Sequence, residues 1–398
     1  MKFLNRAILN FLEHIYRRSG RTRPLPVEKF MPSRINKVLV VSCTAIGDTL
    51  FATPGIRAVK KLLPDAEIHL LVKEKFKALF ATNPWIDSIS GYKGGYKGGL
   101  GLLKEIKGKQ YDLCVIFHDS DPCPAQMAFI AGIPFIFRIG QRDEASAPYL
   151  SGRIPYDQEK HAIDQRLEVI RHLFSVPLDR ETDFRMDLPV DHRRSKSLWE
   201  EIHSTAGCLL EKPRRIGFQF SASGNYKMWP LANFEQLGQR LLEKDKDTVI
   251  CLIGGAGDKK AARKLAEKIV YNTGSFKGRV LNLAGSIRIS DLPEIVLGLD
   301  LLVTNDTGPL HVAIAVGTPT VSLFVPSNFQ ATGPVQDLDI HKVISKPKPC
   351  KPCVEKYCSN PDCMALIKVD EVMEASLKIL NRLDPASNSM KTHRRQMH

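Results

Sequence analysis

Apolar runs alternate with amphipathic segments along the first half of the chain. The runs have the length of buried strands, and the segments between them have helical spacing. Strands that alternate with helices pair in parallel, so this half predicts one parallel α/β sheet. The runs are KVLVVS (37–42), EIHLLV (67–72), SISGY (88–92), YDLCVIF (111–117) and IPFIFRIG (133–140), and the half closes with the helical HAIDQRLEVIRHLF (161–174).

A second alternation of the same kind fills the second half. A polar stretch from 180 to 212 precedes it and is predicted to join the two halves. Helices are expected near 231–243, 258–270 and 290–297, and from residue 308 onward. The strand-like runs are RRIGFQF (214–220), DTVICLIG (247–254), RVLNLAG (279–285), LDLLVTN (299–305) and TPTVSLF (318–324).

Two such halves predict the α/β fold class, with two Rossmann-like, doubly wound parallel-sheet domains. Ligands of these folds bind at the carboxyl ends of the strands. We therefore expect the chemistry in strand-to-helix loops that face a cleft between the domains. The predicted parts are an N-terminal extension (1–30), a first domain (34–180), a second domain (210–345), and a Cys-rich segment with a C-terminal helix or tail (346–398).

Length and composition support two ordinary domains. The chain has 398 residues, of which 43% are hydrophobic, and this excludes a disordered protein. Nine cysteines without a cleavable signal peptide favour a reducing compartment, with the cytoplasm as the expected location. No apolar run reaches the roughly 18 to 20 residues of a membrane-spanning helix.

The formal net charge of +14 implies an acidic partner, and part of the excess lies at the N-terminus. Residues 1–37 carry nine Lys/Arg and two acids. A basic amphipathic helix here is typical of a segment that lies on an anionic membrane surface; the alternative is a helix packed on the protein's own body. Nucleic acid is disfavoured, because stacking aromatics do not accompany the charge. The apolar positions at helical spacing are Phe3, Leu4, Ala7, Ile8, Phe11, Leu12, Ile15 and Tyr16.

The segment VTNDTGPLHVAIA interrupts two strand-like runs with polar residues at the start of a predicted helix. Backbone N–H groups at a helix start, with the Thr307 hydroxyl, form a site for a phosphate or diphosphate. Asp306 would repel a phosphate, so it is expected to accept hydrogen bonds from sugar hydroxyls or to help cap the helix that Gly308 opens. Capping alone explains Asp306 or Thr307 but leaves His311 without a role.

Two further loops of the second half carry candidate donor-binding residues. In FQFSASGNYKMWP, the hydroxyls of Ser221 and Ser223 with the Lys227 ammonium form a candidate diphosphate clamp; the alternative is a solvated lysine. LIGGAGDKKAA supplies a glycine loop that contains Gly255. Because Lys260 stands where the third glycine of GxGxxG would be, a nicotinamide dehydrogenase is disfavoured.

In the first half, SCTAIGDTLFATP places Asp48 at the start of a helix, after a turn that Gly47 permits. One interpretation is a helix-capping aspartate. The other is a general base that deprotonates an attacking hydroxyl. Both interpretations stay open at this point.

Three segments together resemble glycosyltransferase family 9, the heptosyltransferases of lipopolysaccharide inner-core synthesis. They are AIGDTLFATPGIRAVKKLLPDAEIHLLV, KMWP and TNDTGPLHVAIAVGTPTVSLF, which occur in the family's order. The resemblance covers residues 37 to about 370, and the last segment is the most specific. The loop before Lys227 reads SASGNY in place of a Thr-rich form, and residues 1–30 lie outside the shared region.

The resemblance implies the GT-B architecture, with an acceptor domain at 34–180 and a nucleotide-sugar donor domain at 210–345. It implies ADP-heptose as donor, inversion at the anomeric carbon, and no metal or other cofactor for catalysis. By position, Asp48 corresponds to the family's base and Lys227 to its phosphate-binding lysine. The donor-binding loop corresponds to Asp306, Thr307, Gly308 and His311.

Four cysteines near the C-terminus, Cys350, Cys353, Cys358 and Cys363, lie within fourteen residues. This spacing suits a structural zinc ion or an iron–sulfur cluster. The alternative is reduced or disulfide-linked thiols.

The expected function is transfer of heptose from ADP-heptose to a lipid A/core oligosaccharide in lipopolysaccharide biosynthesis. The expected partners are an ADP-sugar, a lipid-linked oligosaccharide and an anionic membrane surface, and the expected location is the inner face of the inner membrane, on the cytoplasmic side. One alternative is a related GT-B transferase that uses another nucleotide sugar for a different surface glycan. The other is a non-catalytic nucleotide-sugar-binding protein, and the presence of both Asp48 and Lys227 counts against it.

Overall fold

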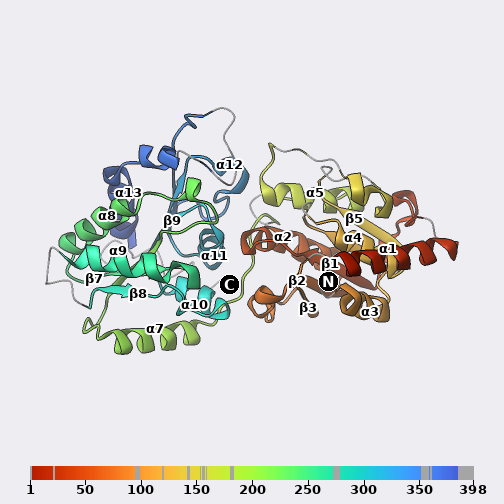
Figure 1. Ribbon diagram of the computed structural model, residues 1–398, viewed down its shortest axis with the longest axis horizontal. Coiled ribbons are helices and arrows are strands. Elements are labelled where there is room, and N and C mark those ends of the chain that lie inside the picture. The colour runs from red at the N-terminus through yellow and green to blue at the C-terminus, as the bar shows by residue number, and fades with distance from the viewer. Residues whose placement is uncertain are drawn as a thin grey trace. The chain divides into compact units, whose positions relative to one another are not determined.

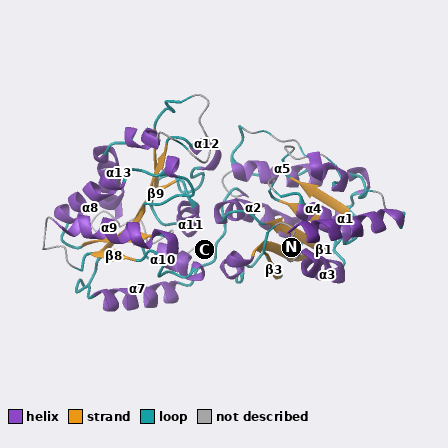
Figure 2. Ribbon diagram, in the orientation of Figure 1, coloured by secondary structure: helices purple, strands orange, loops and turns teal. Residues whose placement is uncertain are grey.

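A computed structural model describes most of the chain, and the chain divides into two compact units, Met1–Pro189 and Val190–His398 (Figure 1). Each unit contains one parallel sheet with helices packed against it (Figure 2). The predicted fold class, two parallel-sheet α/β domains, is therefore confirmed. The described residues are 2–20, 23–94, 99–118, 121–140, 144–152, 154, 157, 159–179, 183–271, 278–350, 358 and 361–383.

The sheet of the first unit has the strand order β3-β2-β1-β4-β5, with all neighbours parallel. Its strands are β1 (Lys37–Ser42), β2 (Glu67–Lys73), β3 (Ser88–Tyr92), β4 (Leu113–Ile116) and β5 (Phe135–Arg138). Its helices are α1 (Lys2–Arg18), α2 (Ile46–Leu62), α3 (Gly99–Lys109), α4 (Cys123–Ile130) and α5 (Ala162–Phe174), with short 3-10 turns at Val27–Lys29, Pro32–Arg34, Glu74–Phe80 and Glu144–Tyr149.

Helix α2 directly follows β1, the central strand, and its first three turns are almost entirely buried. Pro54 lies inside this helix and cannot donate a hydrogen bond to the carbonyl of Leu50. The hydroxyl of Thr53 donates to that carbonyl instead, at 2.7 Å. Gly55 lets α2 approach β4, because a Cβ atom there would lie 2.6 Å from Cζ of Phe117. The start of α2 is thus fixed at the carboxyl end of the sheet.

One face of α1 packs on its own unit, against α3 and α4. Leu9 is fully buried, Tyr16 meets the ring of Phe129 edge-on at 5.1 Å, and Glu13 accepts a hydrogen bond from Gln126. The packed-helix interpretation therefore holds for this face. The opposite face remains exposed, and its largest apolar side chains are Phe11 and Ile15. Within the described part of the chain, every helix is too short or too polar to cross a membrane.

The sheet of the second unit has the order β11-β10-β9-β6-β7-β8 and is also parallel. Its strands are β6 (Arg214–Gln219), β7 (Thr248–Ile253), β8 (Val280–Asn282), β9 (Leu301–Asn305), β10 (Thr320–Phe324) and β11 (His341–Ser345). Its helices are α7 (His192–Ala206), α8 (Leu231–Lys244), α9 (Lys259–Tyr271), α10 (Leu292–Leu297), α11 (Gly308–Val316), α12 (Phe329–Thr332) and α13 (Val369–Leu383), with 3-10 turns at Asn225–Lys227 (η5), Ala256–Asp258 (η6), Ile289–Asp291 (η8) and Pro361–Leu366 (η9).

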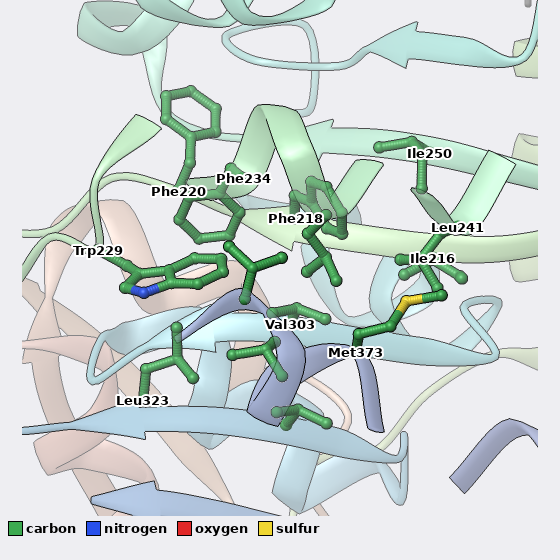
Figure 3. Close-up of a cluster of buried hydrophobic side chains, with 14 of the residues drawn as sticks. Ile216, Phe218, Phe220, Trp229, Phe234, Leu241, Ile250, Val303, Leu323 and Met373 are labelled. Carbon is green, nitrogen blue, oxygen red and sulfur yellow. The ribbon is translucent and has the colours of Figure 1, made fainter. Parts of the chain in front are cut away.

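An aromatic core lies directly beneath the loop that joins β6 to α8. Trp229, at the end of that loop, packs edge-on against Phe234 with ring centroids 4.9 Å apart (Figure 3). Its indole N–H donates to the carbonyl of Ile367 at 2.9 Å. Burial of an aromatic side chain of this size is worth about 3 to 5 kcal/mol relative to alanine. The loop between Phe220 and Trp229 is therefore anchored in the core at both ends.

The stretch over 180–212, predicted to join the two halves, contains a helix that the sequence analysis did not predict, α7. Most of its residues are exposed and polar, and only Ser195 and Trp199 are buried, so its apolar stripe is too narrow to stand out in the sequence. Its ends did carry signals. The Asp191 side chain caps the first turn, accepting from the backbone N–H of Arg193 at 2.8 Å, and Gly207 ends the helix with φ +64°.

Candidate active site

Asn305, at the end of β9, ties together the two loops that the sequence marks for donor binding. Its side-chain oxygen accepts from the backbone N–H of Trp229 at 3.0 Å. Its amide nitrogen donates to the carbonyls of Gln219 (3.3 Å) and Phe220 (3.0 Å). The residue is completely buried. The loop after β6 and the loop after β9 are therefore held side by side.

This junction brings Lys227 against Asp306. The ammonium Nζ lies 2.6 Å from Oδ2 of Asp306, whose side chain is only 7% exposed. On the other side of the carboxylate, Nε2 of His311 lies 3.8 Å from Oδ1. The Asp306 carboxylate is therefore paired, and its use as an acceptor for sugar hydroxyls stays a prediction. It holds the lysine, and His311 joins the same cluster.

Helix α11 begins beside this ion pair. Thr307 occupies the N-cap position with an extended backbone, but its side chain makes no capping hydrogen bond. Its hydroxyl is buried and has no hydrogen-bond partner among the described residues. A helix start with unpaired N–H groups attracts anions. Together, Lys227, the Thr307 hydroxyl and the first N–H groups of α11 are suited to a diphosphate.

The remaining predicted donor-binding residues are Ser221, Ser223 and Gly255, and their positions differ. The Ser221 hydroxyl donates to Oδ2 of Asp258 at 2.9 Å, and the backbone N–H of Gly255 donates to the same oxygen at 2.7 Å. Asp258 thus joins the glycine loop to the loop after β6. This residue was not among those predicted from the sequence. Ser223 lies exposed in that loop. The pattern G-x-x-D at the start of η6 is the signal that would have identified Asp258, since an aspartate three residues after a helix start reaches back to the first N–H.

In the first unit, Asp48 is the third residue of α2. Its Oδ2 accepts from the backbone N–H of Ala45 at 3.3 Å, so the carboxylate does help to satisfy the helix start. Its Oδ1 lies 3.4 Å from Nη2 of Arg166 on α5. The Asp48 side chain is 43% exposed. The carboxylate therefore contributes to the helix start and is also accessible to a substrate hydroxyl.

A buried, positively charged group of residues lies near Asp48, and the sequence reading missed it. Arg138, at the end of β5, donates through Nε to the carbonyl of His118 at 2.9 Å. Burial, together with the cations of Arg138 and Arg166, lowers the pKa of His118 to about 4, so this imidazole is neutral at physiological pH. The available signal was that Arg138 ends one strand and His118 follows another, because parallel strands bring such residues to one edge of the sheet.

The cysteine prediction lies partly outside the described residues, since Cys353 is not among them. Cys363 lies in η9, with Sγ 3.9 Å from the carbonyl oxygen of Tyr226, and the carbonyl of Cys358 accepts from Asn225 at 3.4 Å. Among the described side chains, no group of three or more His, Cys, Asp or Glu is arranged to hold a metal ion. Cys358 and Cys363 thus contact the loop that carries Lys227.

A model of glycosyltransferase family 9 (heptosyltransferase) matches residues 100–364. Lipooligosaccharide heptosyltransferase 2 of Campylobacter jejuni subsp. jejuni serotype O:2 is 25% identical over 352 residues, which cover 86% of this chain and 98% of that protein. Lipopolysaccharide heptosyltransferase 3 of Escherichia coli (strain K12) is 24% identical over 286 residues, which cover 70% of this chain and 79% of that protein.

Solved structures share the two-unit fold. E. coli ADP-heptose LPS heptosyltransferase II superposes with a TM-score of 0.71 at 22% identity, covering 87% of this chain and 99% of that one. E. coli heptosyltransferase WaaC with ADP-2-deoxy-2-fluoro heptose gives a TM-score of 0.62 at 14% identity, covering 86% and 99%.

Proposed function

The chain belongs to glycosyltransferase family 9, the heptosyltransferases, and we propose from this that it transfers a heptose from ADP-heptose to a lipid A/core oligosaccharide with inversion of the anomeric carbon. The observation that carries the proposal is the Lys227–Asp306 ion pair at the start of α11, beside the buried hydroxyl of Thr307. The solved relative WaaC binds an ADP-heptose analogue, which supports a donor of the same class here.

In this proposal the second unit binds the donor. Lys227 and the N–H groups at the start of α11 neutralise the diphosphate, and their effect grows as negative charge develops on the leaving ADP. Asp306 keeps the lysine ammonium in place without approaching the phosphates. Transfer needs no metal, because the lysine and the helix start supply the positive charge.

The first unit supplies the base. Asp48 takes the proton of the acceptor hydroxyl while that oxygen bonds to the anomeric carbon and the bond from this carbon to the diphosphate oxygen breaks. A single displacement of this kind inverts the anomeric centre. General-base assistance of this type is worth roughly 100- to 10,000-fold in rate.

Asp48→Asn tests the assignment, and Asp164→Asn is its matched control. Asp164 is likewise the third residue of its helix, α5, and likewise pairs with an arginine, Arg171, at 2.7 Å. Asparagine retains a side-chain oxygen that can accept the Ala45 N–H. We expect Asp48→Asn to lower kcat roughly 100-fold or more with ADP affinity unchanged, and Asp164→Asn to leave kcat within a factor of two. Near-wild-type turnover of Asp48→Asn refutes the assignment.

The alternative donors and the non-catalytic alternative are separated by a panel of nucleotide sugars. A ligand present at about 100 times its Kd stabilises the folded state by roughly 2.7 kcal/mol. ADP-heptose is expected to raise the melting temperature most, and release of ADP in the presence of acceptor distinguishes a transferase from a binding protein.

We also propose that the protein attaches to the cytoplasmic face of the inner membrane through the exposed face of α1. Phe11 and Ile15 are 62% and 49% exposed, one helical turn apart, in the most basic part of the chain. Phe11→Ser with Ile15→Ser is expected to reduce binding to vesicles that contain anionic phospholipid, whereas Leu209→Ser, a control at a 95% exposed leucine of the other unit, is not.

A structural metal at the four cysteines stays a prediction, and metal analysis of protein purified without oxygen tests it.

A further inference from the structure

Arg166 is a buried cation in direct contact with the proposed base. Its side chain is only 5% exposed. One arm of its guanidinium, Nη1, donates to the carbonyl of Ala162 at 2.7 Å, and the other, Nη2, reaches Oδ1 of Asp48 at 3.4 Å. A charge this deeply buried is costly unless it is paired, and Asp48 provides the pairing carboxylate.

The arginine is itself held rigidly by the packing of α2 against α5. The ring of Phe51, one turn after Asp48, contacts two residues: the ring of His161, the N-cap of α5, is 5.6 Å away and edge-on, and Cζ of Arg166 on α5 lies 5.6 Å from the ring centroid. His161 also caps α5, since its Nδ1 accepts from the backbone N–H of Ile163 at 3.2 Å. The position of Arg166 is thus determined by the helix start and by the aromatic contact.

We propose that Arg166 is a positioning residue that holds the Asp48 carboxylate in the orientation required to take the acceptor proton. The inference rests on the proposed function. Each oxygen of Asp48 is held by a separate donor, Oδ2 by the Ala45 N–H and Oδ1 by Arg166. A carboxylate has about four lone-pair sites, so two such contacts fix its plane and still leave a free acceptor site on the exposed side.

The fork of the guanidinium matters for this role. Arginine presents its donors in one plane, and here two of them bridge a backbone carbonyl of α5 and a carboxylate of α2. A lysine could supply the charge but only from a single point. Asp48 would then keep its ionic partner and lose the fixed direction of the contact.

A purely structural role would join α5 to α2 without affecting proton transfer, and a double-mutant cycle separates the two roles. The variants are Arg166→Gln, Arg166→Lys, Asp48→Asn and the double variant Asp48→Asn with Arg166→Gln. Arg171→Gln is the matched control, because Arg171 is on the same helix and pairs with Asp164 and Glu168. The measurements are kcat, the KM of donor and acceptor, ADP affinity and thermal unfolding.

We expect Arg166→Gln to lower kcat roughly 10- to 100-fold, because a small misplacement of a catalytic group has an effect of this size, while donor KM and ADP affinity stay within a factor of two. In the Asp48→Asn background the same change is expected to alter kcat less than about threefold, since there is no base left to orient. Arg166→Lys is expected to fold with wild-type stability and to recover only part of kcat. Arg171→Gln should match the wild type.

The inference is overturned if Arg166→Gln retains wild-type kcat, or if its effect is fully additive with that of Asp48→Asn. If Arg166→Gln fails to fold, the kcat of Arg166→Lys tests the proposal instead. A stable Arg166→Lys variant with wild-type kcat overturns the positioning role. Failure of the proposed function looks different: Asp48→Asn itself would then remain active. An inactive Asp48→Asn beside a fully active Arg166→Gln contradicts the inference alone.

Discussion

At the scale of single residues, the polar side chains of the second unit's loops are bonded to one another. Lys227 is held by Asp306, and Ser221 and the Gly255 N–H by Asp258. Such internal bonds fix the positions of the groups before a ligand arrives, and preorganised groups need no rearrangement as charge develops on a leaving group.

Lys227→Met is expected to lower kcat/KM roughly 100- to 1,000-fold through loss of diphosphate stabilisation. It also leaves the buried carboxylate of Asp306 without its ammonium, which should lower the free energy of unfolding by about 1 to 3 kcal/mol. Adding Asp306→Asn should restore the stability and leave turnover low. Lys260→Met, at an exposed lysine of α9, is the control in kinetic assays and melting curves; equal losses in both single variants would contradict the role of Lys227.

The sequence identifies several of these residues without their partners. Lys227 and Asp306 stand out because each is a charged residue in a small-residue loop after a strand. Their contact joins positions far apart in the chain, and only the pairing of β6 with β9 brings them together. Arg166 lies 118 residues from Asp48 inside an ordinary amphipathic helix, so the sequence pattern holds no sign of its contact.

At the scale of elements, each predicted strand run has a matching strand, and the departures come where the apolar signal is weak. Helix α7 was missed because few of its residues are buried, and β11 because only His341 and Ile344 of its five residues are buried. The arrangement of the loops could be predicted in part, because parallel strands place their carboxyl ends at one edge and both loops are therefore expected at the same edge of the sheet. The role of Asn305, which joins the two loops, could be identified only from the structure.

Asn305→Ala should lower the free energy of unfolding by about 2 to 4 kcal/mol, because it removes three hydrogen bonds to buried backbone groups. Asn305→Asp should be comparably destabilising, since it places carboxylate oxygens against the carbonyls of Gln219 and Phe220. Denaturant unfolding and ADP titration measure both effects. Asn282→Ala removes a single bond to the N–H of Ala284 and should cost about 1 kcal/mol or less. If Asn305→Ala lowers the free energy of unfolding no more than this control does, the hydrogen bonds of Asn305 do not hold the two loops together.

At the scale of the whole molecule, two buried histidines link the stability of the fold to pH. Burial lowers the pKa of His118 to about 4, and burial with the neighbouring Lys109 cation does the same for His69. Both rings are neutral in the folded protein, whereas in the unfolded chain they bind a proton near pH 6.5.

Stability is therefore expected to be fully present above about pH 6.5 and to fall as the pH drops toward 4, by up to about 3 kcal/mol for each histidine, because the unfolded state binds more protons in this window. Denaturant unfolding at a series of pH values measures the slope. His118→Gln should remove roughly half of this slope. A free energy of unfolding that stays constant between pH 7 and pH 5 would contradict the buried, neutral state of these rings.

The position of β6 between β7 and β9 also has a consequence for synthesis on the ribosome. The chain emerges in sequence order, so β6, β7 and β8 are available for pairing before β9 exists. At about 5 to 20 residues per second, the wait from β6 to Asn305 lasts on the order of ten seconds. During that interval one edge of β6 has no strand beside it, and an apolar edge of this kind can pair with other chains. The loop with Lys227 can also be fastened only after Asn305 leaves the ribosome. In a nascent chain, the proposed donor site can therefore form only when β6 gains its second neighbour, and both events wait for the synthesis of Asn305.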